Sequence, residues 1–229
     1  MGAMAGPLWA EQTGTGRPLV LLHGNGESHR VFDRMVPALA AGHRLVGLDS
    51  RAHGRSPRGD GPLTIARMAD DVDEALAALG LRGVDLLGFS DGGNVALELA
   101  VRHPGRVGRL VVVGANLYPA GLRATSLAPM RLAHAAARVV PHPRARALTE
   151  RLALMTRDPH LEPADLATVD VPALVVVGRH DVVRPEHSRL IAAALPRARL
   201  ATVPGAGHML PVTHPGPLAR LVEGFLAER

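Results

Sequence analysis

A serine at position 90 lies where a predicted strand gives way to a predicted helix. The apolar run 84–87 precedes it, and the helix-like stretch 94–100 follows it. Gly88 and Gly92 stand two residues to either side of Ser90, and glycines leave room for a backbone that turns sharply enough to strain the central residue. Such a turn projects the serine hydroxyl outwards and is typical of a nucleophile in acyl transfer.

An acid and a histidine follow Ser90 in the chain, each just beyond a predicted strand. Asp181 comes after the apolar run 173–178, and His208 follows the strand-like segment 200–203. Ligand sites of open parallel sheets form at the carboxyl ends of the strands, so both side chains are expected at one edge. We predict that His208 takes the proton of Ser90 and returns it to the leaving group, while Asp181 fixes the histidine tautomer. Taken alone, Asp181 could instead cap the next helix and His208 could be an ordinary loop histidine, but the order of all three favours catalysis.

The charge that develops on a carbonyl oxygen during acyl transfer needs two backbone N–H groups aimed at it. One predicted donor is the N–H of Asp91, directly after the nucleophile. The other is the N–H of Asn25, in the glycine-rich loop 23–26 that follows an early apolar strand. Asn25 and Asp91 therefore form the predicted oxyanion hole.

The carboxylate of Asp91 allows two interpretations. It could face the pocket, bind substrate and favour substrates with a positive group near the scissile carbonyl. Alternatively, it is the first residue of a helix, where a negative side chain is stabilised by the helix dipole whatever the substrate. The sequence leaves both open.

Together these segments resemble the α/β-hydrolase-fold serine hydrolases of the small esterase and acyl-transfer type. The matching motifs span nearly the whole chain, at residues 23–26, 49–56, 88–93, 178–181 and 205–208. The resemblance implies the α/β-hydrolase fold with a triad of Ser90, Asp181 and His208. Ala52 departs from the family pattern, because relatives usually carry glycine there, and this puts the shape of a turn in question rather than catalysis.

Apolar strand-like runs alternate with helix-like stretches along the chain. The predicted strands lie near residues 19–22, 44–48, 84–88, 107–113, 173–178 and 199–203. The predicted helices lie near residues 30–41, 64–79, 91–102, 186–195 and 215–227. This alternation predicts an α/β fold with a mostly parallel central sheet flanked by helices. The run 110–113 lacks polar alternation, as expected of a strand that is buried on both sides.

The chain is expected to form a single domain, residues 1–229, with one long interruption at 116–168. In the family this is where a cap sits, so a small helical cap insertion is predicted. The stretches 126–140 and 144–155 have helical spacing on either side of a proline-rich turn. Caps govern substrate entry, and one of this size is expected to leave the pocket shallow or widely open.

All 26 basic residues are arginine, and the net charge is +5. Much of this charge lies in the predicted cap, where six arginines stand between Gly121 and Arg151 against one acid, Glu150. This surface could recruit anionic substrates, an acidic carrier protein or a lipid surface. It could also be a solvated face of a protein that uses arginine in place of lysine. Nucleic-acid binding is not expected, because three Phe, one Tyr and one Trp offer little base stacking.

Composition favours a single globular enzyme domain, and the predicted triad and oxyanion hole need no metal or organic cofactor. The 229 residues are 47% hydrophobic, enough for a sizeable core. There is no cysteine, which excludes disulfides and thiolate metal sites, and the zinc-hydrolase pattern HExxH is absent. No apolar run approaches the roughly 18 residues of a membrane span, and no signal-like segment is recognised. A cytoplasmic location is expected, and the sequence does not predict the oligomeric state.

No catalytic role is predicted for the histidines outside the triad. His23 is expected to brace the oxyanion loop, and His53 a neighbouring turn. His103, His142 and His187 lie beside proline or charged residues and are predicted to be surface positions.

The predicted activity is that of a serine hydrolase that cleaves a carboxylic ester or related acyl bond of a small molecule through an acyl-enzyme. Perhydrolases, C–C bond hydrolases, thioesterases and lactonases share this apparatus in the family and are alternatives. Epoxide hydrolases and dehalogenases are disfavoured, because they would carry aspartate at the position of Ser90. A hypothesis from another class is a ligand receptor that keeps the fold and the triad but binds without useful turnover.

Overall fold

The computed structural model describes residues 2–228. Its strands are β1 (Gly2–Ala5), β2 (Leu8–Thr13), β3 (Arg17–Leu22), β4 (His43–Asp49), β5 (Val84–Phe89), β6 (Val107–Val113), β7 (Ala173–Gly178) and β8 (Ala198–Val203). Its α-helices are α1 (Val36–Leu39), α2 (Ile65–Ala78), α3 (Asp91–Arg102), α4 (Ala124–Arg138), α5 (Pro143–Thr156), α6 (Pro163–Leu166), α7 (Pro185–Ala194), α8 (Leu210–Thr213) and α9 (Pro215–Leu226). Two 3₁₀ helices are η1 (His29–Phe32) and η2 (Pro119–Gly121).

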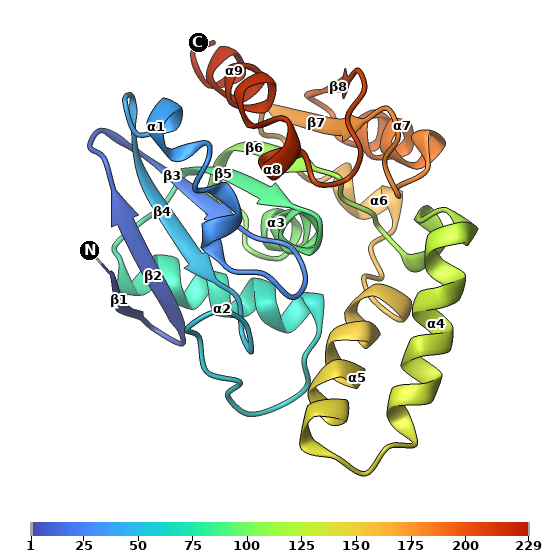
Figure 1. The fold of residues 1–229 in the computed structure, drawn as a ribbon. Helices are drawn as coiled ribbons and strands as arrows, with labels where there is room; N and C mark the ends of the chain where they lie inside the picture. Colours follow the sequence, from blue (N-terminus) through green and yellow to red (C-terminus); the bar gives the residue numbers. More distant parts are fainter. Residues whose placement is uncertain (1, 229) are drawn as a thin grey trace.

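The strands of the described residues form one sheet in the order β1-β2-β4-β3-β5-β6-β7-β8. Strands β3 to β8 pair in parallel with their neighbours, whereas β1 and β2 form an antiparallel edge beside β4. Parallel strands need crossover connections, and here most of them contain helices that cover the sheet (Figure 1). The predicted α/β fold with a mostly parallel, helix-flanked sheet is confirmed.

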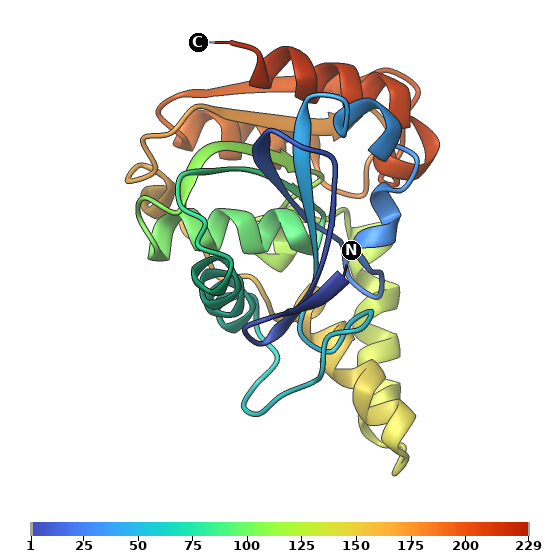
Figure 2. The same cartoon turned by 90° about the vertical axis from the view of Figure 1, so that its left-hand side faces the viewer.

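Two apolar layers lie on opposite faces of the sheet because successive strand residues point to opposite sides. In β3, Val20 and Leu22 join the core beneath α2, α3, α6 and α7. Leu19 and Leu21 join the second core, beneath η1, α1, α8 and α9. Figure 2 shows helices on both sides of the twisted sheet. Burial on both faces explains why the central strands are continuously apolar.

Two elements differ from the sequence expectations. The edge strands β1 and β2 were not predicted, because β2 places only Leu8 and Ala10 in the core and its remaining residues are polar or half-exposed. The predicted helix 30–41 consists of two short pieces, η1 and α1. Pro37 stands in the first turn of α1, and its missing N–H prevents a continuous helix from running through it.

The long connection between β6 and β7 contains η2, α4, α5 and α6. Helices α4 and α5 lie side by side as a hairpin that projects from the body of the molecule (Figure 1). Their bounds lie close to the predicted helical stretches 126–140 and 144–155. Arg58, in the loop after β4, pairs with both carboxylate oxygens of Glu150 in α5, at 2.9 and 3.1 Å. The turn between the two helices, residues 139–142, is exposed.

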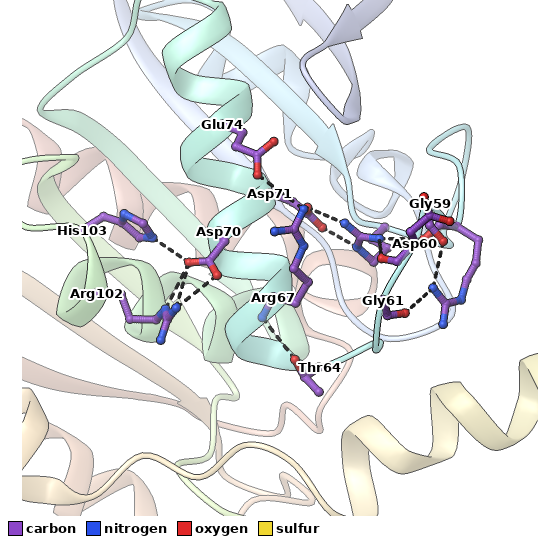
Figure 3. Close-up of polar contacts among 12 residues, drawn as sticks. Gly59, Asp60, Gly61, Thr64, Arg67, Asp70, Asp71, Glu74, Arg102 and His103 are labelled. Carbon is purple, nitrogen blue, oxygen red and sulfur yellow. Dashed lines mark hydrogen bonds and ion pairs between the residues drawn. The ribbon is translucent and has the colours of Figure 1, made fainter.

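A buried ion pair fixes the loop between β4 and α2. Arg51 donates two hydrogen bonds of 2.6 Å to Asp71 in α2, and both side chains are almost completely buried. The remaining terminal nitrogen of Arg51 donates to the backbone oxygens of Arg58 and Asp60, at 3.0 and 2.8 Å. Figure 3 shows Asp71 on the helix and Asp60 in the loop that this guanidinium joins. One side chain therefore determines the path of some ten residues of loop.

The same loop contains Ala52, whose φ is 62°. This left-handed conformation favours glycine, since a Cβ atom costs about 1–2 kcal/mol there. The turn thus has the shape that glycine would suit, and alanine adopts it under strain.

Candidate active site

Ser90 occupies a sharp turn between β5 and α3. Its φ is 55° and its ψ −122°, and its N–H donates to the Val113 oxygen at 2.8 Å. A Cβ atom on Gly88 would overlap the Gly92 oxygen, and one on Gly92 would overlap the Leu22 oxygen. The two glycines therefore allow the strand and the helix to meet closely enough to force Ser90 into this strained conformation.

Three side chains form a continuous chain of hydrogen bonds at the carboxyl ends of β5, β7 and β8. His208 Nε2 lies 2.9 Å from Ser90 Oγ, and His208 Nδ1 lies 2.7 Å from Asp181 Oδ1. A carboxylate can only accept, so Nδ1 carries the proton and Nε2 is left to accept from the serine hydroxyl. The structure thus brings together all three residues of the predicted triad.

Backbone donors hold the carboxylate of Asp181, which is buried. The N–H of Val183 donates to Oδ1 at 3.1 Å, and that of Gly178 donates to Oδ2 at 3.3 Å. A Cβ atom on Gly178 would overlap the Gly207 oxygen, so the loops that carry Asp181 and His208 pack directly on each other. This packing fixes the acid relative to the histidine.

The loop that carries Asn25 lies beside the start of α3. His23 braces this loop as predicted, because its Nδ1 donates to the Gly24 oxygen at 2.7 Å and its Nε2 accepts from the Ser50 N–H at 2.9 Å. Burial lowers the pKa of His23 to about 4, which keeps the ring neutral for both bonds. The N–H groups of Asn25 and Asp91 make no hydrogen bond within residues 2–228. Both predicted oxyanion donors therefore remain available.

The side chains of Asn25 and Asp91 are bonded to each other. Asn25 Nδ2 donates to Asp91 Oδ2 at 2.8 Å and to the Arg151 oxygen of α5, also at 2.8 Å. Asn94 Nδ2 approaches Asp91 Oδ1 at 3.4 Å. Asp91 is buried, and this burial raises its pKa to about 6, although the Asn25 amide opposes the change. The side-chain amide of Asn25 thus connects the loop 23–26 to helix α3 and to the projecting α4–α5 hairpin.

A pocket of about 170 Å³ opens beside Ser90. Its apolar walls come from Phe89, Leu122, Met130, Met155, Val182 and Met209. Its polar and glycine positions are Gly24, Asn25, Glu27, Ser90, Asp91, Gly114, Asn116 and His208. Met130 and Met155 belong to α4 and α5, so the hairpin forms one side of the pocket.

Glu27 and Gly114 are among the pocket residues that sequence reasoning did not single out. Glu27 comes one residue after the glycine-rich loop and accepts from the Gly24 N–H at 3.0 Å. Gly114 follows β6, and a Cβ atom there would lie 3.0 Å from the His208 ring. For Gly114, its place directly after β6 was the available signal, since the carboxyl ends of parallel strands meet at one edge.

One of the histidine predictions was wrong. His187 is buried rather than at the surface, with 5% of its area exposed. Its Nε2 accepts from the Leu117 N–H at 2.9 Å, and its ring packs edge-on against Tyr118. Its charged neighbours in sequence suggested exposure, but α7 turns this residue inwards.

Within the described part of the chain, no group of three or more His, Asp or Glu side chains could hold a metal ion. Over the same residues, no helix combines the length and apolar character required to cross a membrane.

The sequence of this chain is similar to those of known proteins. The family model described as alpha/beta hydrolase fold matches residues 17–153, which include β3 to α5 and the turn at Ser90. The chain belongs to the α/β-hydrolase family. A 2-hydroxymuconate semialdehyde hydrolase of Pseudomonas putida is similar to this α/β hydrolase, with 33% identity over 94% of this chain and 89% of that protein.

Two further relatives cover most of the chain. An sn-1-specific diacylglycerol lipase of Mus musculus is 30% identical over 91% of this chain and 80% of that protein. A solved structure, a hydrolase from Pseudomonas aeruginosa PA01, is 29% identical with a TM-score of 0.82, covering 96% of this chain and 94% of that one. The similarity to members of this family therefore covers nearly the whole chain.

Proposed function

We propose that this α/β hydrolase is a serine hydrolase that cleaves carboxylic esters of small molecules. The observation that carries the proposal is the hydrogen-bonded chain of Ser90, His208 and Asp181, with Ser90 held in a strained turn beside a pocket. Backbone strain is expected at a catalytic nucleophile rather than at a purely structural serine. Ser90 has such strain and also lies beside a histidine that can take its proton.

In the proposed mechanism, Ser90 Oγ attacks the ester carbonyl carbon while His208 Nε2 takes the hydroxyl proton. The carbonyl oxygen becomes negative and is bound by the N–H groups of Asn25 and Asp91. The C–O bond to the alcohol then breaks, and His208 returns the proton to the departing oxygen. Asp181 keeps His208 oriented and stabilises the imidazolium while it lasts.

The second half of the cycle repeats these steps with water as the nucleophile. His208 removes a proton from water, the hydroxide attacks the acyl carbon, and the Ser90 oxygen leaves with the proton from His208. The products are a carboxylic acid and an alcohol. Every step uses only side chains, backbone N–H groups and water.

We further propose that residues 116–168 act as a cap and that acyl chains are short. Met130 and Met155 of the α4–α5 hairpin form part of the pocket wall, and the cavity of about 170 Å³ holds an acetyl or butanoyl group but not an extended palmitoyl chain. Residues of the hairpin thus select the acyl group by size.

The proposal is tested with a fluorophosphonate probe and a series of p-nitrophenyl esters from acetate to palmitate. Wild type should be labelled once and should hydrolyse the short esters steadily, and Ser90→Ala should show neither property. Absence of both labelling and turnover in the wild type would contradict the proposal. A single burst of nitrophenol without further turnover would favour the ligand-receptor hypothesis instead.

A second candidate function is hydrolysis of a compound like 2-hydroxymuconate semialdehyde. A relative that is 33% identical to this chain is named as a hydrolase of that compound. The same serine, histidine and oxyanion donors would serve that reaction. Turnover of this semialdehyde that exceeds the turnover of every short ester would favour the second candidate.

A further inference from the structure

One carboxylate in the pocket has no part in the proposed mechanism. Glu27 follows the oxyanion loop, and its Oε2 accepts from the Gly24 N–H at 3.0 Å. Its Oε1 makes no hydrogen bond within residues 2–228, and no arginine or histidine of that range forms an ion pair with it. Oε1 is not among the buried atoms without a partner, so it is accessible to solvent, and Glu27 is one of the residues that line the pocket.

Glu27 lies close to the proposed nucleophile. A Cβ atom on Gly24 would be 2.8 Å from Glu27 Oε2 and 3.1 Å from Ser90 Cβ, so these two atoms are no more than about 6 Å apart. A substrate whose carbonyl carbon is bonded to Ser90 Oγ therefore places its next two or three atoms within reach of the Glu27 carboxylate. The absence of a side chain at position 24 makes this approach possible.

Asp91, the other carboxylate at the pocket, is less suited to bind a cation. It is almost fully buried, and amide N–H groups of Asn25 and Asn94 already approach its two oxygens. Glu27 is only half-buried and has one backbone donor. Of these two carboxylates, Glu27 is therefore the one with an oxygen that accepts no hydrogen bond from the described residues.

The surroundings of Glu27 leave its charge poorly compensated. Six of the lining side chains are apolar, and the Asp91 carboxylate is unfavourable to the charge of Glu27, whereas His208 is favourable to it only when its ring is protonated. Burial raises the pKa of Glu27 above its ordinary value, and the Gly24 N–H only partly opposes this. A bound cation would relieve both the desolvation and the repulsion.

We infer that Glu27 determines specificity for esters whose acyl group carries a positively charged amine two or three bonds from the scissile carbonyl. The inference rests on the proposed function, because it names the substrate class of the same site. The ammonium group would donate to Glu27 Oε1 while the carbonyl carbon lies at Ser90. A separation of two or three bonds fits the upper limit of about 6 Å between Glu27 Oε2 and Ser90 Cβ.

The test compares two methyl esters of nearly equal shape, β-alanine methyl ester and methyl butanoate. The first ends in an ammonium group at neutral pH where the second ends in a methyl group. Release of methanol gives kcat/KM for each ester, and the ratio of the two is the measured preference. Wild type should prefer the charged ester.

Glu27→Gln removes the charge but keeps an oxygen that can accept from Gly24, so it should lower this preference by about tenfold. Glu27→Asp keeps the charge on a shorter side chain and should retain part of the preference. Glu186→Gln, at an exposed position of α7 outside the pocket, is the matched control for the loss of one negative charge and should keep the full preference. Thermal unfolding checks that each variant is folded.

Two results would overturn the inference. One is a wild type that hydrolyses methyl butanoate without favouring the charged ester. The other is a Glu27→Gln enzyme in which both esters slow equally, because that is the behaviour of a residue that only supports the oxyanion loop. Competition of the two esters against fluorophosphonate labelling gives the same comparison without an assay of released methanol. Absence of labelling in the wild type would instead contradict the proposed function itself.

Discussion

At the scale of single residues, strain is confined to a few positions. Within residues 2–228, Ala52 and Ser90 are the non-glycine residues with positive φ. A strained backbone persists only where the surrounding structure holds it, and at Ser90 the constraint comes from close strand–helix packing across Gly88 and Gly92. The hydroxyl is therefore positioned before any substrate binds.

Asp181→Asn tests the orientation of His208. An amide at this position can donate to Nδ1, which would leave the proton on Nε2 and prevent it from accepting from Ser90. We expect kcat for a short p-nitrophenyl ester to fall by about three to four orders of magnitude, with some loss of thermal stability, because the amide NH2 cannot accept from both the Val183 and Gly178 N–H groups. Steady-state kinetics and a thermal unfolding curve measure the two quantities. A kcat that falls less than tenfold would show that Asp181 does not orient the histidine.

His187 makes stability depend on pH. Burial lowers its pKa from 6.5 to about 4, so between these values the unfolded chain binds a proton that the folded protein does not. The stability that His187 contributes is therefore complete above pH 6.5 and is lost as the pH falls towards 4. His187→Gln keeps an acceptor for the Leu117 N–H but does not titrate. Its free energy of unfolding should therefore fall less steeply than that of the wild type as the pH is lowered from 6.5 to 4. Denaturant unfolding at several pH values measures the slope, and equal slopes would contradict the prediction.

At the scale of elements, the connection between β4 and α2 depends on the buried pair of Arg51 and Asp71. Asp71→Asn should lower the free energy of unfolding by about 3–5 kcal/mol, because it leaves a buried guanidinium without its counter-charge. The double variant Arg51→Met, Asp71→Leu should recover much of this loss, since no buried charge remains. Denaturant unfolding of both variants measures the difference. A double variant no more stable than Asp71→Asn would mean that the bonds from Arg51 to the loop backbone matter more than the charge pair.

The central elements could be predicted from the sequence because their signals are local. Strand β7 is an uninterrupted apolar run, and the glycines around Ser90 mark the turn that follows β5. Asp181 and His208 could be proposed because each stands directly after such a strand. The structure places them within hydrogen-bond distance of each other, as the shared edge of a parallel sheet requires.

Other features depend on contacts between distant segments and left no local signal. The burial of His187 arises from its packing against Tyr118, nearly seventy residues earlier. Glu27 reaches the pocket only because Gly24 leaves space between it and Ser90. The bond from Asn25 to Arg151 joins segments more than a hundred residues apart. Such contacts are decided by the packing of whole elements, which a single sequence does not reveal.

At the scale of the whole molecule, the candidate site is assembled from both halves of the chain. Asn25 and Ser90 come from segments before the α4–α5 hairpin, whereas Asp181 and His208 come after it. The halves meet where β6 pairs with β7, one strand from the β8 edge of the sheet. The hairpin turn at residues 139–142 lies outside these contacts and is exposed.

This arrangement makes the molecule suitable for division into two fragments. A cut after Arg138 would separate residues 1–138, which hold Ser90, from residues 139–229, which hold Asp181 and His208. Neither fragment alone should hydrolyse an ester, whereas coexpressed fragments should regain activity by pairing β6 with β7. Hydrolysis by a single fragment would contradict this prediction. Fused to two proteins that bind each other, the fragments should regain more activity than the unfused fragments do at the same concentration, because the fusion raises their effective concentration.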